Sequence, residues 1–568
     1  MKEPDKNTIH DTFDGSIRYI APVYQRYYVW GYDELQALLD DIENAADQTS
    51  IQFIGATVLQ DLGKKGGTLS PNDYLIVDGQ QRLTTLYLLI CAVVSCYSKA
   101  NKTDDALTLV QTYLAFSAGK YKGMPKLLPT VQDRAQLYTI LEDEIGLITW
   151  NFSTETADRT SRRQGITKQW SSIQKHFSEG FYDSKGRLMS KRLEKFKDNL
   201  FNYIEYIQVT LDSNDDANTA FSKLNFQGIS LSVSDLVRND IFSRLDSDKK
   251  AADSFYVKTW SPFEKSFPGN SFDQYITIYS TIKFKGKTTK ARSFPELQKS
   301  WARKKPALII KELQVYADIY SALIDYSPLQ GMDKDVNEMI RRFSLMPKTT
   351  VTWPYVLQLF NAVREGNYSK KQVIECLCIV ESFLVRRAIV GLEPTGLHAV
   401  FKGLWNKAGS DVTKLKESIV TATIKFPTDK MVDEALKHEN MYKRQITKYI
   451  LIQREITFNK KKGFDNAIDD FSVEHIMPKN RVGQWAKDFT PSMHRIYLNS
   501  IGNLVPLTKK QNSDIKDFDW SKKKVKFKGS NWKLTQKISV LQNWNEEQIK
   551  RQTKEIYRWI IDAWPKIS

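Results

Sequence analysis

The chain has 568 residues and a formal net charge of +17, from 83 basic and 66 acidic side chains. So long a chain exceeds what one hydrophobic core accommodates, and we expect two or three domains. The basic excess favours a polyanionic partner, and no apolar run reaches the roughly 18 residues of a membrane span, so we expect a cytoplasmic protein without membrane contact.

The N-terminal region, residues 1–245, mixes short strands with helices. Ile51 to Gln60 and Tyr74 to Val77 are rich in Ile, Val, Phe and Tyr, which predicts strands. After Val77 the chain turns through Asp78-Gly79-Gln80-Gln81 and continues as an apolar helix from about Leu83 to Cys96. We therefore expect a strand–turn–helix unit here.

This turn is a candidate anion site. The first turn of a helix offers unpaired N–H groups and the positive end of the helix dipole. Gly79 permits a tight turn, and the Arg82 guanidinium can bind a phosphate with two donors. No Gly-x-x-x-x-Gly-Lys-Ser/Thr motif occurs, so a P-loop is excluded. The alternative is a polar turn in which Arg82 forms a structural ion pair.

The middle and C-terminal regions differ in character. Residues 246–435 predict a helical connector, with apolar residues at helical spacing from Lys371 to Val390. Residues 436–568 predict a separate unit, with a strand near Phe471 to Val473 and a final helix from Glu546 to Trp564. The overall expectation is an α+β protein that is predominantly helical.

Glu474 and His475 place a carboxylate beside an imidazole where a strand ends before Pro478. Phosphodiester hydrolysis needs a base for water and a hard cation for the phosphate. Histidine titrates near neutral pH and suits the base. The oxygens of Glu474 and Asn512 suit Mg²⁺ or Mn²⁺, and Asn503 can orient the His475 ring.

A lysine-rich segment follows this motif and is a candidate DNA-binding surface. Its predicted DNA contacts are Lys522, Lys523, Lys524 and Lys526.

The C-terminal motifs resemble a known family. Glu474-His475-Ile476-Met477-Pro478, then Gly502-Asn503-Leu504, then Asn512 before Phe518, are similar to the HNH domain of GmrSD-type modification-dependent restriction enzymes. The resemblance implies a ββα-metal nuclease fold. It implies that His475 is the general base and that Asn503 orients it. Glu474 and Asn512 would be the metal ligands.

The N-terminal motifs resemble the same family. They are the segments Tyr24 to Trp30, Phe53-Ile54-Gly55, Asp78 to Arg82, and Phe221 to Gly228 followed by Ser234-Asp235-Leu236. The resemblance implies a ParB/sulfiredoxin-like domain that binds and hydrolyses a nucleoside triphosphate (GTP, ATP or another). The implied nucleotide-binding residues are Arg26, Asp78, Gly79, Gln80, Gln81, Arg82 and Asn225, with Asp235 bracing the pocket.

The sequence thus predicts three parts: an NTP-binding domain (1–245), a helical connector (246–435) and an HNH nuclease domain (436–568). We expect an NTP-regulated, metal-dependent endonuclease that cuts foreign, modified double-stranded DNA in anti-phage defence. A homo-oligomer is compatible with the sequence. Two alternatives stay open: a nucleotide-gated DNA clamp with a non-cutting HNH fold, and an RNase.

The aromatic cluster of Tyr24, Tyr27, Tyr28 and Trp30 either stacks a base or belongs to the core.

Overall fold

The computed structural model describes most of the chain: residues 4–22, 25–45, 51–64, 70–152, 164–212, 232–245, 249–269, 271–347, 350–392, 396–421, 423–459 and 470–567. Several residues named above lie outside these ranges, namely Tyr24, the motif from Phe221 to Gly228 and, with it, Asn225. The described chain forms two compact units. Unit 1 contains residues 1–264 and 300–310, and unit 2 contains residues 265–299 and 311–568.

Unit 1 is built on a mixed six-stranded sheet in the order β1-β6-β3-β4-β2-β5. β3 lies between β6, to which it is parallel, and β4, to which it is antiparallel. The two strands expected from sequence are β3 and β4. The sequence did not single out β6, which is the last of the six strands along the chain and lies between β1 and β3 in the sheet. The strands are β1 (Asp5–Thr8), β2 (Ile17–Ile20), β3 (Gln52–Lys64), β4 (Asn72–Asp78), β5 (Leu127–Leu128) and β6 (Ile204–Leu211).

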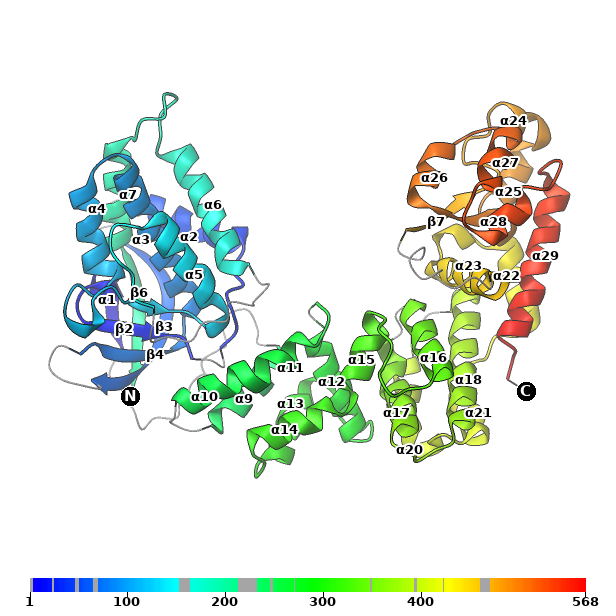
Figure 1. Cartoon of the computed structure of the whole chain (residues 1–568), viewed down its shortest axis with the longest axis horizontal. Coiled ribbons are helices and arrows are strands. Elements are labelled where there is room, and N and C mark those ends of the chain that lie inside the picture. The colour runs from blue at the N-terminus through cyan, green and yellow to red at the C-terminus, as the bar shows by residue number, and fades with distance from the viewer. Residues whose placement is uncertain are drawn as a thin grey trace. The chain divides into compact units, whose positions relative to one another are not determined.

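Helix α3 (Gln80–Lys99) is the central helix of unit 1. It is buried from Gln80 to Tyr97 except at the half-buried Arg82, and it packs against α4, α5 and α6 (Figure 1). Together with β4 it confirms the expected strand–turn–helix unit. The other helices of this region are α1 (Ile9–Phe13), α2 (Tyr32–Asn44), α4 (Thr103–Leu109), α5 (Val131–Glu144), α6 (Gly165–Gly180), α7 (Ser190–Asn202), α9 (Val233–Ser243) and α10 (Lys249–Phe255).

The described residues from 249 to 459 contain helices and no strands, as expected for the middle of the chain. The longest of these helices is α18 (Lys370–Val390), which matches the periodic stretch in the sequence. Its neighbours include α16 (Lys334–Leu345), α17 (Trp353–Arg364), α21 (Val412–Ile419), α22 (Asp429–His438) and α23 (Gln445–Phe458). Elsewhere in this stretch lie α11 (Ser261–Lys265), α12 (Phe272–Lys283), α13 (Ser293–Trp301), α14 (Pro306–Leu313), α15 (Ala317–Ile324), α19 (Leu397–Phe401) and α20 (Leu404–Ala408).

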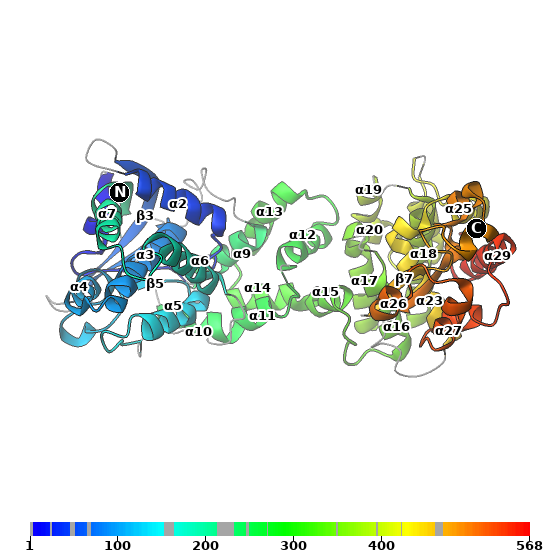
Figure 2. The same ribbon diagram turned by 90° about the horizontal axis from the view of Figure 1, so that it is seen from above.

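The C-terminal part of unit 2 contains a two-stranded antiparallel hairpin. β7 (Phe471–His475) pairs with β8 (Leu504–Thr508), so that His475 faces Leu504 in the register. Helix α26 (Lys509–Ile515) follows β8 directly and packs on β7, and Figure 2 shows β7 beside α26 and α23. The remaining helices are α24 (Gln484–Asp488), α25 (Pro491–Tyr497), α27 (Trp520–Lys528), α28 (Lys533–Ile538) and α29 (Glu546–Ala563).

A separate apolar core holds this hairpin in place. Ile476, Val505, Phe527 and Trp544 are fully or almost fully buried members of the cluster beneath it. Among the described helices, none is both long and apolar enough to cross a membrane.

Candidate functional site

His475 is the last residue of β7, and Glu474 precedes it. Side chains that follow one another on a strand point to opposite faces, so a shared site requires the strand to end there. The strand does end at His475, and the chain then bends through Ile476 and Met477 toward Pro478. The sequence expectation about this strand end is therefore confirmed.

The imidazole of His475 is buried, with 4% of the residue exposed. Its Nε2 lies 3.0 Å from Oδ1 of Asn499, and the ring of Tyr442 lies 4.2 Å away between ring centroids. An amide oxygen only accepts hydrogen bonds, so with this orientation of the amide His475 carries its proton on Nε2. The lone pair of the neutral ring is then on Nδ1.

Burial lowers the pKa of His475 to about 4. The hydrogen bond to Asn499 opposes this shift, whereas the charges of Lys479, Lys523 and His494 add to it. His475 is consequently neutral at physiological pH, which is the form that accepts a proton.

Glu474 forms an ion pair with Lys523 of α27. Lys523 Nζ lies 2.6 Å from Glu474 Oε1 and 2.7 Å from the carbonyl oxygen of His475. Burial raises the pKa of Glu474 and lowers the pKa of Lys523, and each charge opposes the shift of the other. The strand end therefore carries a buried carboxylate already paired with a cation.

Asn512, on α26, contacts the same strand. Its Nδ2 donates to Ser472 Oγ at 2.5 Å and to the Val473 carbonyl oxygen at 3.2 Å. Because the nitrogen is used in this way, the amide oxygen is the atom of Asn512 that remains for a cation.

In unit 1, the turn from β4 into α3 is set by Gly79. Its φ is +92°, in the left-handed region, and a Cβ there would lie 2.6 Å from Thr57 Oγ1. Helix α3 starts at the next residue, so its free N–H groups lie directly after the Asp78 carboxylate. Burial raises the pKa of Asp78, while the charges of Arg82 and Arg26 lower it.

Arg82 is fixed against β3. Its Nη1 donates to the Ala56 carbonyl oxygen at 2.7 Å, and a Cβ on Gly55 would lie 2.8 Å from Arg82 Nη2. Gly55 has φ +104° at an irregularity in the pairing of β3 with β6. The glycine of Phe53-Ile54-Gly55 thus makes room for the arginine of the turn.

Gln81 connects the turn to the segment before α2. Its Oε1 accepts from the backbone N–H of Val29 at 2.8 Å and of Trp30 at 3.3 Å, and its Nε2 donates to the Tyr27 carbonyl oxygen at 3.2 Å. The turn and residues 27–30 therefore form one structural unit.

Two family models match the chain in the regions just described. The model for the GmrSD restriction endonuclease N-terminal domain matches residues 9–242, and the model for the GmrSD C-terminal domain matches residues 426–559. The chain belongs to the GmrSD restriction endonuclease family. No curated protein matches it. As a member of this family it is a nuclease of the restriction endonuclease class, and its substrate is DNA.

Asn503 of this GmrSD-family chain does not contact the His475 ring. It is fully buried, and its Oδ1 accepts from the N–H of Met477 at 2.8 Å and from Trp544 Nε1 at 3.1 Å. Its Nδ2 donates to the Met477 and Leu498 carbonyl oxygens, both at 2.9 Å. The expectation that Asn503 orients the ring is wrong in this geometry. Asn503 holds the loop after His475, and Asn499 contacts the ring instead.

Asn499 was missed because the family motif contains no residue at this position. The sequence signal that could have pointed to it was its place three residues before Gly502-Asn503-Leu504.

Lys523 is also placed differently from the expectation. The helical spacing of Trp520, Lys523 and Phe527 puts all three on the inward face of α27, and the Lys523 side chain is fully buried. Lys523 is thus not available to a DNA phosphate. Lys522 and Lys526 are exposed on the outer face, and Lys524 is partly exposed.

The donor chemistry of Glu474 and Asn512 fits a hard divalent cation, since both offer oxygen. Within the described part of the chain, no group of three or more His, Cys, Asp or Glu side chains could hold a metal ion. A cation here would rely on one carboxylate, one amide oxygen and non-protein oxygens. Lys523 occupies one oxygen of that carboxylate.

Around the start of α3 lie buried polar atoms without hydrogen-bond partners in the described structure. They are both amide atoms of Gln80, which is 4% exposed, and the hydroxyl oxygens of Thr57 and Thr84. Native proteins seldom leave buried polar groups unpaired, because each costs about 1–3 kcal/mol. This cluster is therefore a candidate position for a polar ligand.

The aromatic segment before α2 belongs in part to the core. Tyr28 is 2% exposed, its hydroxyl lies 2.6 Å from Thr85 Oγ1, and burial raises its pKa. Trp30 packs partly buried against the same core. Tyr28 therefore has the structural role that was the alternative to base stacking.

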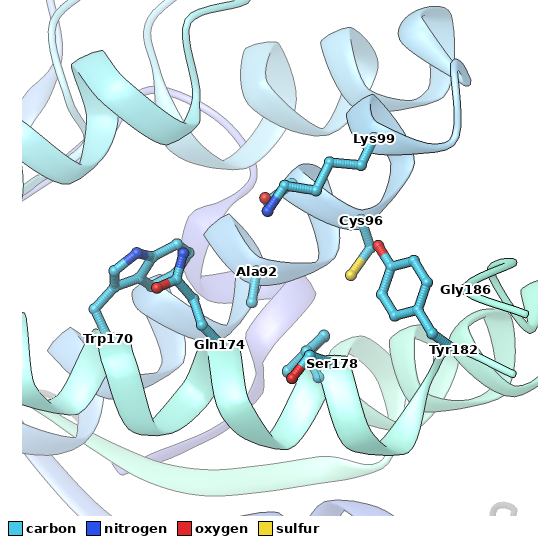
Figure 3. Close-up of a pocket in the computed structure, with 10 residues that line it drawn as sticks. Ala92, Cys96, Lys99, Trp170, Gln174, Ser178, Tyr182 and Gly186 are labelled. Carbon is cyan, nitrogen blue, oxygen red and sulfur yellow. The ribbon is translucent and has the colours of Figure 1, made fainter. Parts of the chain in front are cut away.

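Unit 1 also has a cavity of about 400 Å³ between the second half of α3 and α6 (Figure 3). Lys99 and Gln174 at this cavity both contact Glu144, at 3.8 Å and 3.0 Å. Ser178 donates to a backbone carbonyl of its own helix. These polar groups are bonded within the protein, and the cavity lies at the opposite end of α3 from Gly79.

Proposed function

We propose that this GmrSD-family protein is an NTP-regulated, metal-dependent HNH endonuclease in which His475 is the general base. The observation that carries the proposal is the burial of a neutral His475 whose Nε2 is held by Asn499. This arrangement leaves the Nδ1 lone pair to take a proton from the attacking water.

The other residues of the site have roles that follow from their contacts. Asn499 fixes the ring and its tautomer, and Asn503 fixes the loop that leads away from the base. Glu474 and Asn512 would hold Mg²⁺ or Mn²⁺, which supplies charge neutralisation at the scissile phosphate. Lys522, Lys524 and Lys526 would bind neighbouring phosphates of double-stranded DNA.

The proposal for unit 1 is a nucleotide site in a ParB/sulfiredoxin-like domain that spans residues 1–245. The free N–H groups at the start of α3 and the guanidinium groups of Arg26 and Arg82 suit the phosphates of GTP, ATP or another triphosphate. The unpartnered amide of Gln80 supports a polar ligand at this position. Gln81 would act indirectly, because its amide already holds the 27–30 segment.

Nucleotide binding would regulate cutting only if the triphosphate prefers one state of the protein over another. We propose that the helical residues 246–435 transmit this preference to the nuclease domain, residues 436–568. The physiological target is foreign, modified DNA, which places the protein in anti-phage defence.

The decisive experiment is a plasmid-cutting assay with Mg²⁺ or Mn²⁺ and each nucleotide, using unmodified and modified DNA and an RNA competitor. Cutting of DNA that is lost in His475→Ala, with DNA binding retained, supports the nuclease. Binding without cutting under every metal and nucleotide supports a nucleotide-gated clamp instead, and preferential loss of RNA supports an RNase.

The nucleotide site is tested separately. Arg82→Ala removes a proposed phosphate contact, and we expect NTP hydrolysis and phage restriction to fall together. If both remain at the wild-type level in Arg82→Ala and Gln81→Ala, the N-terminal proposal is wrong, whereas the nuclease proposal stands on the plasmid assay alone.

A further inference from the structure

The ammonium of Lys523 is bound by two acceptors inside the nuclease region. It donates to Glu474 Oε1 at 2.6 Å and to the His475 carbonyl oxygen at 2.7 Å. The Lys523 side chain is 0% exposed and that of Glu474 is 9% exposed. Lysine is almost never buried without a charged partner, and here its partner is the proposed metal ligand.

We propose that Lys523 is a resident cation of the Glu474 carboxylate, which a divalent metal ion must displace in order to bind there. The proposal rests on the proposed function in one respect, namely that Glu474 is a metal ligand. It adds that Lys523 is a positioning residue that weakens metal binding and thereby sets the metal concentration at which the site is loaded.

Glu474 is a buried carboxylate also when no metal is bound. A buried carboxylate that loses the cation paired with it is strongly disfavoured, because water does not replace the lost interaction. Lys523 supplies the paired cation to Glu474. It pairs with the carboxylate directly, with Lys523 Nζ 2.6 Å from Glu474 Oε1.

A divalent metal ion and the Lys523 ammonium compete for the Glu474 carboxylate. A divalent ion on the same carboxylate lies within a few ångströms of the ammonium, and like charges repel strongly where water is excluded. The ammonium has a second acceptor, the His475 carbonyl oxygen, which can retain it when Glu474 turns to the metal. Trp520 and Phe527 flank Lys523 on the same helix face and are buried, so its stem has little freedom to leave.

The test is Mn²⁺ binding to the full chain without DNA, measured by calorimetry and by electron paramagnetic resonance of free Mn²⁺. Lys523→Met keeps the length of the side chain and removes its charge, and we expect Mn²⁺ to bind about tenfold more tightly or better. Lys528→Met removes an exposed lysine of the same helix that has no assigned role, and it is expected to leave the affinity unchanged. If the affinity of Lys523→Met is unchanged or weaker, the proposal is overturned.

Glu474→Gln separates this proposal from the one on which it rests. If Glu474→Gln leaves Mn²⁺ binding intact, Glu474 is not a metal ligand, and the proposed function fails at that residue together with this inference. If Glu474→Gln abolishes binding but Lys523→Met does not tighten it, only the role of Lys523 is wrong.

Loss of the buried ion pair also affects stability, so the experiment includes a second readout. We expect Mn²⁺ to raise the melting temperature of Lys523→Met by more than that of the wild type, because at a fixed Mn²⁺ concentration the stabilisation of the folded state rises with the logarithm of the affinity. Should Lys523→Met not fold, Lys523→Gln keeps a donor toward Glu474 without the charge and is expected to show the same tighter binding. Equal metal-induced shifts in the wild type and the variant would contradict the proposal.

Discussion

The imidazole Nε2 of His475 donates to Oδ1 of Asn499 across 3.0 Å, between residues 24 positions apart in the chain. Asn499 is itself held by a third segment, because its carbonyl oxygen accepts the N–H of Met441 at 2.9 Å. The ring of Tyr442, next to Met441, packs on His475. The orientation of the proposed base is thus decided by residues outside the strand that carries it.

Asn499→Ala should lower the rate of DNA cutting about tenfold to a hundredfold, because the ring loses its partner and its fixed tautomer. Since this hydrogen bond raises the pKa of His475, its loss should also move the acid limb of the pH–rate profile to lower pH. Asn499→Asp should move the limb in the opposite direction. A fall in rate without any movement of the limb would indicate a purely structural role.

His475→Ala should reduce cutting by about 10²–10⁴-fold with little change in DNA affinity. In the wild type, burial lowers the pKa of His475 to about 4, so the base stays unprotonated through mildly acidic pH. Activity should therefore persist well below pH 6.5. If the rate of DNA cutting by the wild type instead fell with an apparent pKa near 6.5, the prediction of a buried, neutral base would be contradicted.

Folding stability should depend on His475 between about pH 6.5 and pH 4. In that window the unfolded chain binds a proton at His475 and the folded chain does not, so stability falls as the pH falls. With a folded pKa of about 4, the loss attributable to this residue is about 3 kcal/mol. Chemical unfolding at a series of pH values should show a shallower dependence for His475→Gln than for the wild type.

Gly79→Ala should destabilise unit 1 by about 1–3 kcal/mol and weaken nucleotide binding. Its φ of +92° is strained for alanine, and the new Cβ would lie 2.6 Å from Thr57 Oγ1. Gly119 is a matched control, because it has φ +63° but no atom within 4 Å of an added Cβ. Thermal unfolding should show a clearly larger effect at Gly79 than at Gly119.

Lys522→Ala and Lys526→Ala should each weaken DNA binding with little regard to sequence. Each should also reduce the slope of log affinity against log salt by about 1, as expected for the loss of one phosphate contact. Lys195→Ala, an exposed lysine of α7 in unit 1, serves as a charge-matched control. If the slope of log affinity against log salt were the same for all three variants, α27 would not be part of the DNA-binding surface.

Much of the candidate site was predictable because it depends on local chemistry. Gly79 before an apolar helix indicated a tight turn at a helix start, and the structure has that turn. The sequence predicted a strand near Phe471 to Val473 with a break at Pro478, and the structure has β7 ending at His475. The second strand, β8, came only from the resemblance to a ββα fold, and Asn512 lies on the helix that follows it.

The sequence by itself determined where the functional groups lie along the chain: the Asp78–Arg82 turn, the Glu474-His475 strand end and the lysine-rich helix. Local propensities and motif spacing specify these features, since each involves residues within a few turns of one another. Only the tertiary structure decided which groups meet. It brought Asn499 rather than Asn503 to His475, and it turned Lys523 inward onto Glu474 while Lys522 stayed exposed. Contacts between distant segments depend on how helices and strands pack. That packing cannot be predicted from composition or from motif spacing.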